Sequence, residues 1–149
     1  MTRCVISARV ENKYGVLARV TGLFMRKGFN IDSLSVGETE NPAVSRITIT
    51  LDGDEFARKQ LICQLQKLYN VEHVSLLEER VERELLLMKV RNTFESKAAA
   101  EKLRGKIVAD TTDAVCIEVV GEPEKINDFI AGMKPFGILE MCRTGVAAI

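Results

Sequence analysis

The sequence has no surplus of charge of either sign. Its 149 residues include 21 Lys and Arg and 21 Asp and Glu, so the formal net charge is zero. Proteins that bind nucleic acids usually carry a basic excess, and we therefore expect no nucleic-acid partner. Aromatic residues make up only 5% of the chain, which also argues against the stacking surfaces that hold single-stranded RNA.

Long hydrophobic runs are absent as well. No apolar run approaches the roughly 18 residues of a membrane helix. A strand pattern begins at Arg3 with no apolar segment before it, so no secretory signal is visible. We expect a cytoplasmic protein without a membrane partner.

The chain is poor in residues that bind metals. It has one histidine, His73, and four cysteines, at positions 4, 63, 116 and 142, with no two in a C-x-x-C pair. A structural zinc site usually needs four such ligands at close spacing. We therefore expect no metal site, and we interpret the cysteines as reduced thiols packed like small hydrophobic side chains.

Catalytic motifs are missing too. The sequence contains no nucleophile elbow, phosphate-binding loop or paired-carboxylate signature. His73 falls in a predicted strand beside Glu72, but neighbouring strand residues point to opposite faces. We expect no catalytic residue in this chain and look for a binding function instead.

The same order of elements occurs twice in the chain. In the first half, alternation predicts strands at 3–10, 29–36, 46–51 and 71–77, and helical spacing predicts helices at 16–27 and between 54 and 70. In the second half, strands are predicted at 84–91, 105–109, 115–120 and 138–143, with helices at 96–103 and 123–135. This order predicts an α+β fold with two tandem ferredoxin-like βαββαβ units, each an antiparallel sheet with helices on one face.

We place the domain boundary between residues 78 and 79, in the charged connector 78–84. The N-terminal domain is then 1–78 and the C-terminal domain 79–149. Each has a size at which one hydrophobic core gives marginal stability, and open sheet edges are a liability. Both arguments predict a homodimer.

The joint between the first strand and the first helix has the features of a small carboxylate site. The first amides of a helix lack internal partners and lie at the positive end of its dipole. Gly15 would let a ligand approach the backbone, and Val16, Leu17 and Ala18 would add amides. Asn12 can bind both a carboxylate and an ammonium group.

Asn30 and Ile31 begin the next predicted strand. Asn30 could face the same space, while Ile31, with Val16 and Leu17, could line a pocket for a short aliphatic side chain. A small amino acid would satisfy all these features. The residues alone leave a second interpretation open, in which Asn12 and Gly15 are turn or capping residues and Asn30 only begins a strand.

Longer motifs resemble a known family. Residues 12–37, with the pattern N-x-x-G-V-L-A-R-V-x-G-L-F-x-R-K-G-F-N-I-D-S-L-S-V-G, are similar to the small regulatory subunit of acetolactate synthase (acetohydroxyacid synthase). Further matches are S-R-I-T-I-T at 45–50, V-E-R-E-L-L-L-M-K-V at 81–90, R-G-K-I-V-A-D at 104–110 and R-T-G-V-A at 143–147. The first unit alone resembles an ACT domain, which is a class of amino-acid sensors.

The resemblance implies a regulatory subunit of branched-chain amino acid biosynthesis that performs no chemistry itself. It would bind a catalytic large subunit that carries thiamine diphosphate, Mg²⁺ and FAD, raise its activity and confer feedback inhibition. Valine or a related amino acid would bind between the ACT domains of two copies. Carried onto this chain, the effector contacts are Asn12, Gly15, Val16, Leu17, Ala18, Asn30 and Ile31.

Two other functions are considered. A stand-alone ACT-type sensor could regulate another metabolic enzyme. An RRM-like RNA-binding module shares the element order, and Arg26-Lys27-Gly28-Phe29 resembles the start of an RNP1 motif. However, the next residues lack the glycine or alanine and the second aromatic of RNP1, and the segment ends a predicted helix.

Overall fold

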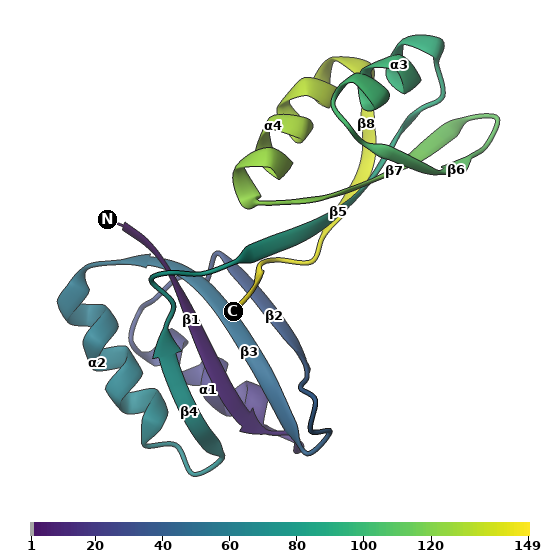
Figure 1. Ribbon diagram of the computed structural model, residues 1–149. Helices are drawn as coiled ribbons and strands as arrows, with labels where there is room; N and C mark the ends of the chain where they lie inside the picture. The colour runs from purple at the N-terminus through teal and green to yellow at the C-terminus, as the bar shows by residue number, and fades with distance from the viewer. Residues whose placement is uncertain (1) are drawn as a thin grey trace. The chain divides into compact units, whose positions relative to one another are not determined.

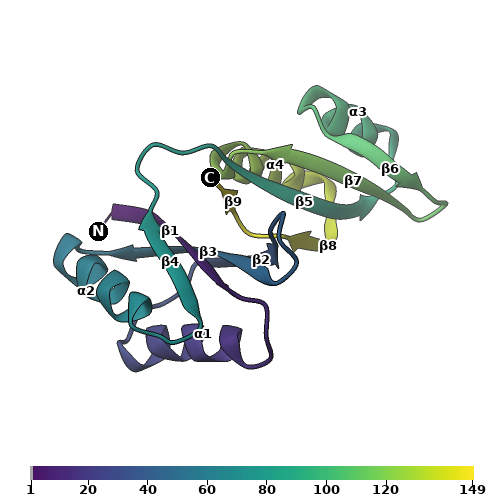
Figure 2. The ribbon, with the colours of Figure 1, turned by 60° about the horizontal axis from the view of Figure 1, so that its bottom comes forward.

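Two similar units make up the computed structural model, which describes residues 2–149 (Figure 1). The first unit runs up to Val81 and also includes Val146–Ile149, while the second is Glu82–Gly145. Each has the βαββαβ order and an antiparallel sheet. Figure 2 shows both helices of the first unit on one side of its sheet. The predicted fold class, two tandem ferredoxin-like units, is confirmed.

The sheet of the first unit has the order β2-β3-β1-β4. Its elements are β1 (Thr2–Glu11), α1 (Val16–Arg26), β2 (Ser33–Glu38), β3 (Val44–Gly53), α2 (Glu55–Gln66) and β4 (Val71–Leu76). In the central pairs, Ile6 lies opposite Ile49 and Ala8 opposite Val74. Within this unit β2 and β4 are therefore the sheet edges.

The helices of the first unit follow from their sequences. The apolar residues of α1 that recur at helical spacing, Val16, Val20, Leu23 and Phe24, are all buried. α2 begins after Asp54, whose carboxylate accepts a hydrogen bond from the Ala57 amide at 2.7 Å, as a helix N-cap does. The core that they form with the sheet includes Ile6, Ala8, Val10, Ile47, Ile49, Leu51, Leu61 and Leu65.

The predicted strand at 29–36 was wrong at its start, because β2 begins only at Ser33. The Phe29 amide bonds to the Phe24 carbonyl at 3.0 Å, and Gly28 has a φ of +72°, so this stretch is a helix end. Phe29 and Ile31 pack against the core from a loop. Their apolar character reflects this packing and not a strand.

The last four residues belong to the fold of the first unit, although the sequence pattern had placed them in the C-terminal domain. Val146 and Ala148 are buried and form a cluster with Val5, against which Leu77 packs. Ile149 and Val81 exchange two backbone hydrogen bonds, of 2.9 and 3.1 Å. This tail, which contains β9 (Ala147–Ala148), packs on Val5, whose side chain points away from the helices.

The second unit has the strand order β6-β7-β5-β8. Its elements are β5 (Glu82–Arg91), α3 (Phe94–Lys102), β6 (Lys106–Asp110), β7 (Ala114–Gly121), α4 (Pro123–Met133), a 3₁₀ turn (Lys134–Phe136) and β8 (Ile138–Arg143). Alternating strand residues and one face of α4 form its core, which includes Leu86, Met88, Val90, Val115, Ile117, Val119, Ile126, Phe129 and Met133.

A buried ion pair joins the first and last strands of the second unit. The Glu84 side chain is only 4% exposed. Its two oxygens accept hydrogen bonds from Nε and Nη2 of Arg143, at 2.6 and 2.8 Å. This bond to Glu84 is the main cause of the raised pKa of Arg143. A two-point contact between guanidinium and carboxylate is strong and directional, so it fixes the end of β8 from which the tail departs.

Val146→Ala tests the contribution of the tail to stability. We expect the free energy of unfolding to fall by about 1–2 kcal/mol, because buried methyl groups are lost. The measurement is urea unfolding followed by circular dichroism. Ile149→Ala is the control, since Ile149 is 73% exposed and its truncation should have little effect. Equal destabilisation by the two changes would show that the tail does not pack as described.

Glu84→Gln tests the buried ion pair. Arg143 would lose its charged partner, but its side chain is 33% exposed and water would replace part of the interaction. We therefore expect a loss of about 1–3 kcal/mol of unfolding free energy in chemical denaturation. Glu140→Gln breaks the exposed pair with Lys89 and should change stability by less than about 0.5 kcal/mol. A Glu84→Gln protein as stable as this control would contradict the assignment.

Candidate functional site

The first helix begins without a side-chain cap. Gly15, its N-cap residue, has φ +80° and ψ −8°, no side-chain oxygen bonds to the helix start, and the first turn contains no acidic residue. This positive φ favours glycine. A Cβ added at Gly15 would meet nothing within 4 Å, so the space in front of the helix is open. Its first amides are therefore accessible to an acceptor from outside.

Asn12 fastens the loop before this helix to the β2–β3 hairpin. Its Nδ2 donates to Oε1 of Glu38 at 3.2 Å and to the carbonyl of Pro42 at 2.9 Å. Its backbone amide donates to the carbonyl of Ala43 at 2.8 Å. Asn12 thus has a structural role at the site, and it lies beside the end of edge strand β2.

Charged residues hold the other side of the loop. Nζ of Lys13 lies 2.9 Å from Oε2 of Glu11, and Asn70 donates to the same oxygen at 2.8 Å. The hydrogen bond from Lys13, followed by that from Asn70, lowers the pKa of Glu11, and the same contact with Glu11 raises the pKa of Lys13. Asn12, Lys13 and the exposed Tyr14 line an open depression of about 470 Å³.

The remaining residues predicted near the helix start differ in what they expose. Leu17 and Ala18 are exposed, whereas the Val16 side chain is buried in the core. The Val16 amide donates to the Lys13 carbonyl at 3.4 Å. Val16 can therefore contribute to a ligand only through its backbone, while Leu17 offers an apolar side chain.

Asn30 and Ile31 lie at the opposite end of the same sheet. The Asn12 amide bonds to the carbonyl of Ala43, and the Asp32 amide bonds to the carbonyl of Thr50. From residue 43 to residue 50 the strand spans about 23 Å, at about 3.3 Å per residue. One copy of the chain therefore brings together Asn12, Gly15, Leu17 and Ala18, but it does not bring Asn30 and Ile31 to them.

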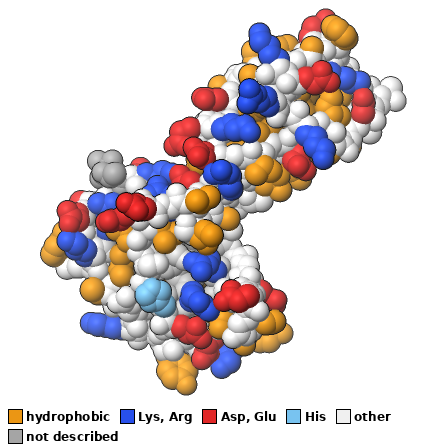
Figure 3. Space-filling model, in the orientation of Figure 1, with side chains coloured by type: hydrophobic (Ala, Val, Ile, Leu, Met, Phe, Trp, Pro, Cys, Tyr) orange, Lys and Arg blue, Asp and Glu red, His pale blue; other side chains and the backbone are white. Residues whose placement is uncertain are grey.

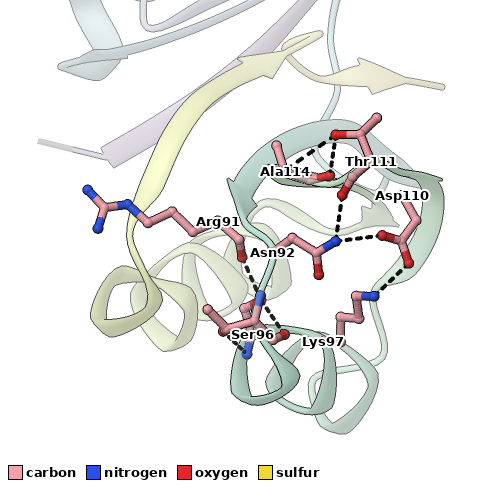
Figure 4. A network of polar contacts seen from close by, with 8 residues as sticks. Arg91, Asn92, Ser96, Lys97, Asp110, Thr111 and Ala114 are labelled. Carbon is pink, nitrogen blue, oxygen red and sulfur yellow. Dashed lines mark hydrogen bonds and ion pairs between the residues drawn. The ribbon is translucent and has the colours of Figure 1, made fainter.

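The second unit repeats the asparagine contact, as Figure 4 shows. Asn92 follows β5 as Asn12 follows β1, and its Nδ2 donates to Oδ1 of Asp110 at 2.8 Å and to the Thr111 carbonyl at 2.5 Å. Its backbone amide bonds to the Asp113 carbonyl at 3.1 Å. In both units, therefore, an asparagine ties the first loop to the following hairpin.

The two helix starts are nevertheless different. In the second unit Thr93 Oγ1 accepts from the Ser96 amide at 3.0 Å, and Ser96 Oγ accepts from the Thr93 amide at 3.1 Å. This capping box satisfies the start of α3 with its own side chains. α1 has no such contact. Of these two helices, α1 is therefore the one whose first amides have no side-chain partner.

The cysteines and the histidine were predicted only in part. Cys4 is buried, as expected, and burial raises its pKa. However, Cys63 and Cys142 are exposed, which corrects the expectation that all four pack as small hydrophobic side chains. His73 lies on β4 and is exposed. Among residues 2–149, no group of three or more His, Cys, Asp or Glu side chains is placed to hold a metal ion.

None of the helices in the described part of the chain is long and apolar enough to cross a membrane. The stretch that resembles RNP1, residues 26–29, begins at the last residue of α1 and continues into the following loop. It does not lie on the third strand, where RNP1 occurs in RNA-binding modules.

Comparison with known families gives two matches. Residues 6–73 match the ACT domain described as AHAS small subunit-like, and residues 83–149 match the small subunit of acetolactate synthase. Together these matches cover both units.

Whole-chain relatives agree with these matches. Probable acetolactate synthase small subunits of Archaeoglobus fulgidus and Methanothermobacter thermautotrophicus are 46% and 44% identical, over 97% of this chain and 94% and 90% of theirs. The crystal structure of the small subunit from Thermotoga maritima is 38% identical, covers 100% of this chain and 97% of that one, and superposes with a TM-score of 0.91. The chain belongs to the family of acetolactate synthase small subunits.

Proposed function

We propose that this chain is the regulatory subunit of a cytoplasmic acetolactate synthase and binds valine or a related branched-chain amino acid. The chain itself is not catalytic. Its partner is the catalytic large subunit, which carries thiamine diphosphate, Mg²⁺ and FAD. The bound amino acid provides feedback inhibition in branched-chain amino acid biosynthesis.

One observation carries the proposal: α1 starts uncapped at Gly15, whereas α3 is capped by its own Thr93 and Ser96. An effector carboxylate would accept hydrogen bonds from the amides of Leu17 and Ala18, at the positive end of the helix dipole. The side-chain oxygen of Asn12 would accept from the effector ammonium group. Leu17 would contact the aliphatic side chain.

The opposite positions of Asn12 and Asn30 favour a site shared by two copies. β2 is an edge strand in the first unit, and its backbone can pair with β2 of a second copy. In an antiparallel pair the end of one β2, near Asn12, lies beside the start of the other, near Asn30. Asn30 and Ile31 of the second copy would then complete the site, and the chain would be a homodimer.

Regulation would follow from the shared position of the effector. A ligand held by two copies stabilises one relative arrangement of those copies over others. It can shift this equilibrium only by its difference in affinity for the two arrangements. The catalytic subunit would respond to the arrangement and not to the ligand itself.

A stand-alone amino-acid sensor is the alternative. It would bind an effector at the same place but would not associate with a large subunit. Co-purification of the chain with the acetolactate synthase large subunit of the same organism separates the two functions. Calorimetric titration with valine, leucine and isoleucine identifies the effector.

Gly15→Asp tests the carboxylate site. The new charge would repel the effector carboxylate. A side chain at Gly15 meets no other atom, and although the φ of +80° strains any residue with a Cβ, aspartate is among those that best tolerate positive φ. We expect calorimetry to show at least a hundredfold loss of valine affinity, which corresponds to about 2.7 kcal/mol. Gly15→Asn is the control, because asparagine has nearly the same size and tolerates positive φ but adds no charge. If both variants bind valine equally, or Gly15→Asp binds like the wild type, the site is wrong.

Subunit mixing tests whether two copies share the site. Gly15→Asp and Asn30→Ala should each abolish binding alone, since every site would then have one defective half. After equal amounts are unfolded and refolded together, half of the dimers are mixed, and each has one intact site. Calorimetry should then recover about a quarter of the wild-type sites. No recovery, with dimers confirmed by light scattering, would place the effector within a single copy.

A further inference from the structure

A row of basic side chains crosses the first sheet on the face away from its helices. Arg9 on β1 lies directly opposite Arg46 on β3 and His73 on β4. Directly opposed residues of an antiparallel pair project from the same face, with Cβ atoms about 5 Å apart. Figure 3 shows the histidine beside Lys and Arg side chains on the visible face of the molecule. We call Arg46, Arg9 and His73 the basic row.

The surrounding residues neutralise this row poorly. Like charges directly opposite each other destabilise a sheet. Arg46 Nη1 donates to Ser7 Oγ at 2.6 Å, which is an uncharged acceptor. Among the described residues, Arg9 has one carboxylate partner, Glu40, at 3.7 Å, and the Glu40 side chain is 82% exposed. In addition, Nε of Arg9 is buried without a hydrogen-bond partner in the described structure.

Neither arginine belongs to the proposed effector site or to the hydrophobic core. The repulsion between them is therefore not explained by a role within the first unit. The tail covers the other end of this face, where Val146 contacts Ser33 through a 3.3 Å hydrogen bond and packs with Val5. The basic row thus occupies the part of the face that the tail leaves uncovered. Repulsion between like charges is expected at a surface that binds a partner of opposite charge.

We propose that the basic row is the surface on which an acidic segment of the catalytic subunit docks. This inference rests on the proposed function, since it names how that partner is recognised. Two or three carboxylates spaced along an extended segment would match Arg46, Arg9 and His73. Arginine can bind carboxylates through two parallel hydrogen bonds, and the buried Nε of Arg9 would gain an acceptor if its side chain turned outward.

The chemistry of the face favours an acidic protein over RNA. Single-stranded RNA is held on a sheet by aromatic side chains that stack on its bases. The residues that share this face of β1 and β3 are Arg3, Val5, Ser7, Arg9 and Glu11, with Val44, Arg46, Thr48, Thr50 and Asp52 opposite them. None of them is aromatic, and the carboxylate of Glu11 is already held by Lys13 and Asn70. Hydroxyl groups and arginines are suited to bind carboxylates but offer no stacking platform.

The basic row is also connected to the effector site. Glu40, the acidic contact of Arg9, lies in the β2–β3 connection, and Asn12 holds the same connection through Glu38 and the Pro42 carbonyl. Glu40 therefore competes with an external carboxylate for Arg9. An effector that draws Asn12 away from the hairpin would change how strongly Glu40 competes, and this links valine binding to docking.

Variants at the basic row test the inference by measuring the Kd for the purified catalytic subunit. Arg9→Gln combined with Arg46→Gln should weaken association at least about tenfold at low salt, and the difference should shrink in about 0.5 M salt, where charges are screened. Glu40→Gln should strengthen association severalfold, because the internal competitor is gone. Valine should still bind to both variants in calorimetry, because Arg9, Arg46 and Glu40 are not among the proposed effector contacts.

Lys59→Gln is the control for a positive charge lost elsewhere in the first unit, because Lys59 lies on α2, in the helical layer. It should leave the Kd for the catalytic subunit unchanged. If the double variant associates as tightly as this control at low salt, the docking surface is wrong while the proposed function stands. If the double variant loses retention on single-stranded RNA but not on the catalytic subunit, the partner is wrong. If the wild-type chain does not associate with the catalytic subunit, the proposed function itself fails.

Discussion

The start of α1 is the feature on which the rest of this molecule depends. A helix must leave its first amides without internal partners, and proteins usually satisfy them with a side chain. Here Gly15, in a left-handed conformation, leaves them accessible. The surrounding contacts, Asn12 with the hairpin and Lys13 with Glu11, hold the loop in place without filling that space. The proposed site therefore depends on the missing side-chain cap at the helix start as much as on the residues around it.

The two units have the same fold but differ at the start of their first helix. Both use an asparagine after the first strand to tie the loop to the next hairpin. The difference lies in the residues that follow: Thr93 and Ser96 cap α3 from within, while the first unit has Tyr14 and Gly15 and begins its helix later. The shared contact ties the loop to the hairpin in both units, and the two helix starts differ in whether side chains cap them.

The fold was predictable from sequence because strands and helices of both units carry clear periodicity, as in β1 and α1. The start of β2 could not be predicted in this way. Phe29 and Ile31 are apolar because they pack against the core from a loop, and their spacing resembles that of a strand. The helix-start residues of the candidate site were predictable from local rules. The separation of Asn30 from Asn12 was not, because it depends on the register between β2, β3 and β1, and register depends on pairing over long sequence separations. The packing of Val146 and Ala148 on Val5 was hidden for the same reason.

The positive charge of Arg9 and Arg46 on one face of the first sheet is a second indication of function, and it does not depend on the start of α1. Arg9 and Arg46 are adjacent in space but distant in sequence, so only the sheet register reveals that they oppose each other. Sequence composition had indicated the reverse, since the total charge is zero. Neutrality of the whole chain is compatible with a concentrated positive row, because its compensating acids lie elsewhere. Glu40 is the acid that contacts Arg9, and it lies in the connection to which Asn12 bonds. The same hairpin therefore contacts both the proposed effector site, through Asn12, and the charged face, through Glu40. This shared contact is the simplest physical route by which occupancy of one would alter the other.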